Sequence, residues 1–199
     1  MNLLLSIYFF IIAIIQAGLL VGIYHYYRAQ DVVKPSHYWL GSLLASVAAL
    51  FIFGGGIIVI KDIASPEFNF TIGNTLFYVA AVMQALFCRS LNKEVSKGLK
   101  IFLNISIVAF LLVFEWLRQT SNFEVRTAFM CVLASVFYLW QIYELRKKNQ
   151  TAFSSQLRYL QYASFGELFF AMGRLAILLA STITIRQVEQ IPQILILFT

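Results

Sequence analysis

Six polar side chains interrupt stretches that are otherwise apolar, and their types are the ones that could support binding chemistry. Ionisable and amide groups are costly inside a membrane, so those that occur there are functional-site candidates by default. Carboxyl and guanidinium groups can form ion pairs or bind a proton or a ligand, and amides can orient a ligand through hydrogen bonds. We therefore predict a polar, ligand-binding core that contains Gln16, Asn74, Gln84, Glu115, Glu167 and Arg174.

Glu167 and Arg174 lie seven residues apart, so they share one face of a helix at a separation of about 10 Å along its axis. This spacing is wide for a direct contact, and we expect Arg174 to meet Glu115 across a helix bundle. Gly166 and Gly173 would let a neighbouring helix approach that face. Three interpretations stay open: a structural clamp, a ligand or proton site facing an outer cavity, or an Arg174 side chain that reaches the membrane interface.

The elements that hold these residues are predicted to be membrane-spanning helices. A span needs about 20 largely apolar residues, and six segments qualify: residues 2–24, 38–60, 70–87, 101–117, 123–143 and 159–183. A seventh run, residues 191–199, is too short to cross, so we predict an incomplete seventh span and a cytoplasmic output domain after residue 199. The fold class is an all-α, polytopic transmembrane bundle. Within it, the run Gly54-Gly55-Gly56 favours close helix packing over a hinge.

Composition leads to the same class. Of 199 residues, 60% are hydrophobic and only 12% are charged, whereas soluble domains carry roughly 25% charged residues. A surface in contact with water could not be covered with so few charges. The composition also excludes disordered, coiled-coil and disulfide-rich secreted proteins.

The distribution of basic residues predicts the orientation. Ten Lys and Arg residues lie in or beside the first, third and fifth loops, and four lie in or beside the second, fourth and sixth. Because basic residues favour the cytoplasmic side, we predict an N-terminus outside and a C-terminus toward the cytoplasm of a bacterial inner membrane. Topology accounts for the net charge of +6, and no nucleic-acid partner is predicted.

Several kinds of catalysis are excluded. No span contains a lysine for a retinal Schiff base or an aspartate for an intramembrane aspartate protease, and no zinc-protease, serine-hydrolase or phosphate-loop motif occurs. His25 and His37 lie at the same predicted interface and could hold a haem, but solvated interfacial histidines are the more common arrangement. We predict no cofactor, no metal and no enzymatic activity within this chain.

Two stretches resemble the N-terminal membrane regions of bacterial diguanylate cyclases, the GGDEF proteins. These stretches are YRAQDVVKPSHYWLGSLLASVAALFIFGGGIIVI, from Tyr27, and FNFTIGNTLFYVAAVMQALFCRSLNK, from Phe68. Shared features are a basic loop with an aromatic residue at the start of the next helix, and an outer loop that runs into Gly73-Asn74. The resemblance covers roughly residues 22–185, helix by helix, and related modules occur on histidine kinases. It implies a sensory input module coupled to a cytoplasmic output domain.

Two other functions remain open from the sequence: a small seven-helix transporter and an integral structural subunit of a membrane complex. Short loops leave no soluble ligand-binding domain, so the expected ligand is small or lipophilic and enters from the bilayer or an outward-facing cavity. The expected partners are the lipid bilayer and a second copy of the chain, because cytoplasmic output domains commonly act in pairs.

Overall fold

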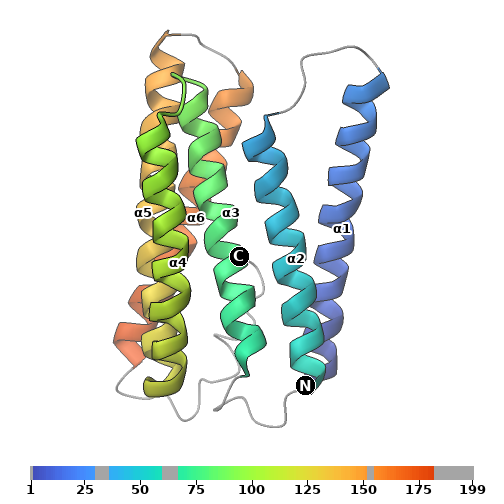
Figure 1. Ribbon diagram of the computed structural model, residues 1–199, viewed down its shortest axis with the longest axis vertical. Coiled ribbons are helices and arrows are strands. Elements are labelled where there is room, and N and C mark those ends of the chain that lie inside the picture. The colour runs from blue at the N-terminus through green and yellow to red at the C-terminus, as the bar shows by residue number, and fades with distance from the viewer. Residues whose placement is uncertain (1, 30–35, 60–66, 152–154, 182–199) are drawn as a thin grey trace. The chain divides into compact units, whose positions relative to one another are not determined.

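The computed structural model describes residues 2–29, 36–59, 67–151 and 155–181, and within them the regular secondary structure is helical throughout. Six helices follow one another along the chain (Figure 1). Their bounds are α1 Asn2–Ala29, α2 His37–Val59, α3 Phe68–Ser90, α4 Lys97–Thr120, α5 Phe123–Thr151 and α6 Ser155–Ser181. All six are long and apolar enough to cross a membrane, which confirms the six predicted spans and indicates an integral membrane protein. The predicted seventh run lies outside the described residues.

Most helices extend beyond the predicted spans, because hydropathy reports only the apolar part of a helix. Polar residues that cap the ends explain where some of them begin. The Ser96 hydroxyl accepts a hydrogen bond from the Leu99 amide at 3.3 Å at the start of α4, and the Asn122 side chain accepts one from the Val125 amide at 3.1 Å at the start of α5. Such side chains satisfy the free N–H groups of a first helical turn.

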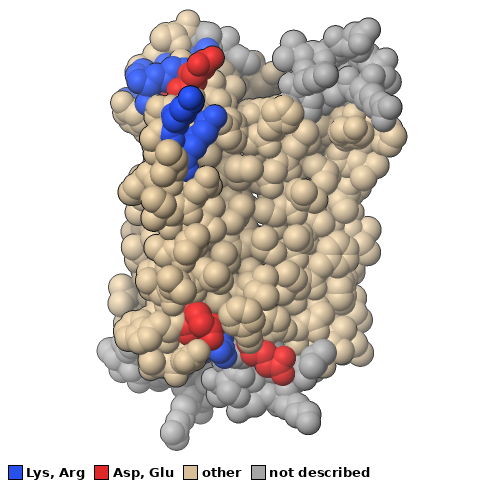
Figure 2. Space-filling view, viewed as in Figure 1, with Lys and Arg blue, Asp and Glu red and all other residues tan. Residues whose placement is uncertain are grey.

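The structure divides into two compact units, each described separately here. Unit 1 comprises residues 1–87 and 95–120, and so contains α1, α2, most of α3, and α4; unit 2 comprises residues 88–94 and 121–199, and so contains the end of α3, the loop after it, α5 and α6. On the visible face, charged side chains gather near helix ends and leave the helix middles uncharged (Figure 2). Exposed apolar side chains on those middles are the expected contacts with lipid.

Small residues bring α1 and α2 of unit 1 together. Ala13 and Ala49 are fully buried, and the Ser6 hydroxyl donates a 2.6 Å hydrogen bond to the Gly54 main-chain carbonyl. A Cβ added at Gly54 would stand 3.2 Å from the Phe10 ring. The expectation that this glycine run serves close packing therefore fits Gly54, because the ring lies directly on its backbone.

An aromatic cluster connects α2 with α3, and a stack connects α3 with α4. The Phe53 ring packs against the rings of Phe70 and Phe77 at centroid distances of 5.3 and 5.5 Å. The Tyr78 ring stacks on Phe110 at 4.4 Å, and its hydroxyl donates to Ser106 at 3.1 Å. Offset aromatic stacking provides specific packing between helices that otherwise present similar apolar surfaces.

Candidate functional site

The helix pair α5–α6 of unit 2 contains a line of polar side chains along its interface. We call this line the polar seam. It consists of Cys131, Tyr138, Gln141 and Asn149 on α5, and Gln161, Ser164, Glu167 and Arg174 on α6.

Hydrogen bonds fix how the two antiparallel helices pair along the polar seam. The Asn149 amide donates to Gln161 Oε1 at 3.0 Å, and the Ser164 hydroxyl lies 3.4 Å from Gln141 Oε1. Tyr138 lies three residues before Gln141 on α5, and Glu167 lies three residues after Ser164 on α6. Antiparallel helices that pair at one level pair again one turn away, and Tyr138 and Glu167 do interact electrostatically.

The same register continues to the other end of the seam. Cys131 lies seven residues before Tyr138, and Arg174 lies seven residues after Glu167. These two residues also interact electrostatically. The sequence spacing placed Glu167 and Arg174 on one face of α6, and that face is the one that packs on α5.

Three buried polar atoms of the seam have no hydrogen-bond partner among the described residues. One is Asn149 Oδ1 toward one end of the seam, and the other two are Glu167 Oε2 and Gln141 Nε2 at its centre. Gln141 is 0% exposed and Ser164 is 1% exposed. Buried polar atoms are nearly always hydrogen-bonded, so an unpartnered pair one helical turn apart calls for an explanation. Chemically, the pair offers an amide donor and a carboxyl oxygen to a proton, a water molecule or a small polar group.

A second polar cluster lies in unit 2, and its members satisfy one another. Glu144 of α5 is 1% exposed and forms a 2.5 Å ion pair with Arg89 at the end of α3. The Asn92 amide donates to Glu144 Oε2 at 2.7 Å and to the Glu144 main-chain carbonyl at 2.8 Å. The Trp140 indole N–H lies 3.4 Å from Glu144 Oε1. This cluster ties the loop after α3 to α5.

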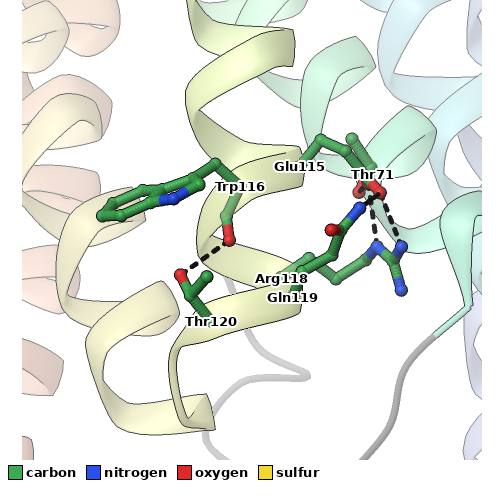
Figure 3. A network of polar contacts seen from close by, with 6 residues as sticks. All are labelled: Thr71, Glu115, Trp116, Arg118, Gln119 and Thr120. Carbon is green, nitrogen blue, oxygen red and sulfur yellow. Dashed lines mark hydrogen bonds and ion pairs between the residues drawn. The ribbon is translucent and has the colours of Figure 1, made fainter.

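Glu115 has charged and polar partners within unit 1 that the sequence did not predict. Its carboxylate is held by an arginine of its own helix and by a hydroxyl of α3 (Figure 3). Arg118 Nη2 and Nε lie 2.5 and 2.9 Å from its two oxygens, and the Thr71 hydroxyl donates to it at 2.7 Å. The sequence prediction placed Arg118 in a loop, but α4 continues to Thr120 and so brings Arg118 onto the same face as Glu115.

The other predicted residues belong to unit 1. Asn74 of α3 donates to the main-chain carbonyl of Phe70 at 2.8 Å, a contact within its own helix. Gln84 is half-buried on α3. Gln16 of α1 is half-buried, and its Oε1 atom is buried without a partner among the described residues. Of the six predicted residues, Glu167 and Arg174 belong to the polar seam of unit 2, and the other four belong to unit 1.

Several residues of these clusters escaped the sequence prediction. Arg89 was counted among the loop residues, and both Arg89 and Glu144 lay just outside the predicted spans, which ended at residues 87 and 143. Gln141 lay inside a predicted span, and its amide was a signal that could have been used, as was the hydroxyl of Ser164 within the following span.

No protein-family model, curated protein or solved structure matches this chain.

Proposed function

We propose that this chain is the membrane-embedded sensory input module of a bacterial signal-transduction protein, with the polar seam as its receptor site. The observation that carries the proposal is that two buried atoms on α5 and α6, Gln141 Nε2 and Glu167 Oε2, have no hydrogen-bond partner in the part of the chain that the structure describes. A structural clamp would be expected to satisfy its polar atoms, as the Glu144 cluster does. An unsatisfied pair leaves bonding capacity for something that arrives and leaves.

The mechanism follows from helix packing. A ligand that changes the bonding of the pair, and that binds one arrangement of α5 and α6 better than another, shifts the population toward the arrangement that it binds better. Displacement of α6, the helix that holds Glu167, is the route by which the signal is relayed to a cytoplasmic output domain. The resemblance to the membrane regions of diguanylate cyclases supports a diguanylate cyclase as that output.

The proposal includes a topology and an assembly. The bias of Lys and Arg toward alternate loops supports an N-terminus outside and a C-terminus in the cytoplasm, in the bacterial inner membrane. A homodimer is included because such output domains act in pairs, and crosslinking of native membranes tests it.

The test uses the product of the native gene in its own host. Cells expressing Glu167→Gln are compared with cells expressing Glu94→Gln, which removes the same charge at an exposed position of unit 2. The readout is cellular cyclic di-GMP per amount of inserted protein. Allosteric coupling typically changes an equilibrium about 5- to 150-fold, so we expect the Glu167→Gln value to change about fivefold or more and the Glu94→Gln value to stay unchanged. Equal output from both inserted variants would refute the proposal.

A further inference from the structure

The packing around Glu167 limits which chemical kinds of ligand the polar seam can bind. We propose that Glu167 is a reversible proton-binding site, and that the proton is the ligand to which the α5–α6 pair responds. The effect of this proton on signalling rests on the proposed function. Binding of the proton to Glu167 is a separate claim with a test of its own.

Glu167 lacks a positively charged partner among the described residues. Among the residues that the structure describes, no cation lies within ion-pair distance of Glu167, whereas Glu144 on the neighbouring helix is paired with Arg89. An isolated carboxylate within a membrane-spanning helix is expensive, and proteins avoid the cost by pairing it or by neutralising it with a proton. Arg174 on the same helix is seven residues away and interacts with Cys131 instead.

The second argument is the identity of the groups that face Glu167. Tyr138 of α5 and Cys88 at the end of α3 are its electrostatic neighbours in unit 2. Cys88 also interacts with Glu144. The tyrosine and cysteine side chains are neutral, and Glu144 carries negative charge, so none of the three supplies the positive charge that would hold Glu167 permanently ionised.

The third argument is the amide beside it. The Ser164 hydroxyl has one proton and two acceptors within reach, the Leu160 carbonyl at 3.1 Å and Gln141 Oε1 at 3.4 Å. The shorter contact takes the proton, so the Gln141 amide is held only loosely. When Glu167 is ionised, the Gln141 N–H groups can turn toward the carboxylate and form a charge-assisted hydrogen bond. When Glu167 is protonated, only a weaker, neutral hydrogen bond to its carbonyl oxygen is available. Proton binding therefore changes the bonding across the seam.

A proton also fits the available space. Gln141 and Ser164 are almost completely excluded from solvent, and their helices pack closely together. A proton adds no volume to such an interface. The step itself is simple: a proton leaves water, an O–H bond forms at the Glu167 carboxylate, and no oxidant or reductant takes part.

The test follows the carboxyl group directly, in the full chain reconstituted in lipid. Infrared difference spectra between acidic and alkaline buffer should contain a carboxylic-acid C=O band at the high frequency typical of an apolar, weakly hydrogen-bonded site. Glu167→Gln should abolish that band, and the matched control Glu94→Gln should keep it. Should Glu167→Gln fail to insert, Glu167→Asp carries the test, because it must retain a pH-dependent band. Absence of the wild-type band, or its persistence in Glu167→Gln, would overturn the inference, as would its loss in a folded Glu167→Asp variant.

A second readout reports the helix response. Trp140 lies between Tyr138 and Gln141 on α5, and replacing Trp39 and Trp116 with Phe makes it the sole tryptophan. Its emission should change with pH in this reporter protein and lose the change completely when Glu167→Gln is added. A pH transition that survives Glu167→Gln would refute the coupling. If Glu167→Gln abolishes the infrared band but leaves cyclic di-GMP unchanged, Glu167 binds a proton and the proposed sensory function is refuted. If Glu167→Gln changes cyclic di-GMP but the infrared band is absent from the wild type or persists in the variant, proton binding at Glu167 is refuted and the sensory function stands.

Discussion

The Glu144 cluster permits the sharpest prediction about stability, because its two charged members are buried to different extents. Glu144 is 1% exposed as a side chain and Arg89 is 23% exposed. Glu144→Gln keeps the shape but replaces a carboxylate oxygen with an amide N–H that faces a donor, either Arg89 or Asn92. Arg89→Gln instead leaves the Glu144 carboxylate buried without its cation.

The difference in burial between Glu144 and Arg89 sets how much unfolding free energy each variant is expected to lose. Hydrogen bonds to charged groups contribute about 1.5–3 kcal/mol each, and the Arg89 guanidinium left behind in Glu144→Gln can still reach water. We expect Glu144→Gln to lower the free energy of unfolding by about 2–3 kcal/mol. Breaking a buried pair so that a buried charge remains costs about 3–5 kcal/mol, so Arg89→Gln should be the more damaging single variant. The double variant should cost clearly less than the two single costs together, because the second substitution removes a charge that the first left unpaired.

The assay is reversible unfolding of the full chain in mixed micelles, followed by circular dichroism. Arg146→Gln serves as the control, because Arg146 is an exposed basic residue on the same helix as Glu144, and it should change the unfolding free energy by less than about 0.5 kcal/mol. The reasoning would be refuted if the losses of unfolding free energy in the two single variants add up, to within about 0.5 kcal/mol, to the loss in the double variant. It would also be refuted if Arg89→Gln is less damaging than Glu144→Gln.

Two further predictions test the packing and the topology. Gly55→Ala should be tolerated, because a Cβ at Gly55 meets nothing within 4 Å. Gly56→Ala should destabilise unit 1 by about 1–3 kcal/mol, because a Cβ at Gly56 runs into the Asn69 amide and the Phe70 ring. Equal thermal stability of the Gly55→Ala and Gly56→Ala variants would contradict this packing. A cysteine placed at the exposed position of Glu94 should react with an impermeant maleimide only from the cytoplasmic side of inverted vesicles, because Lys and Arg concentrate in that loop; labelling from the periplasmic side of intact spheroplasts would reverse the proposed orientation.

The helices were predictable from the sequence because their signal is local. A run of about 20 apolar residues has few alternatives in a protein of this composition, and the six spans of the structure lie where the hydropathy placed them. Their ends were less predictable. Ser96 and Asn122 cap α4 and α5 through side-chain geometry, to which a count of apolar residues is insensitive.

The partners of the polar residues could not be predicted because pairing across helices depends on register. The seven-residue spacing of Glu167 and Arg174 correctly placed both on one helix face, but no sequence pattern indicated that Tyr138 and Cys131 would lie opposite them. Glu115 illustrates the other failure. Its nearest cation was three residues away on its own helix, and only the continuation of α4 beyond the apolar stretch made that pairing possible.

Two glutamates of the α5–α6 pair in unit 2 differ in their surroundings, and this contrast is the strongest argument for function in this chain. Glu144 is buried and Glu167 is half-buried, and both interact electrostatically with Cys88. Glu144 has an arginine and an asparagine amide in contact with it, so its environment is complete without any ligand. Glu167 has a buried oxygen with no partner among the described residues, and the same holds for the amide nitrogen of Gln141 one helical turn away. Because a loosely held amide requires little rearrangement to engage a newly formed charge, a change in charge at Glu167 acts on the helix contact itself. A change at Glu144 would mainly destabilise the loop after α3.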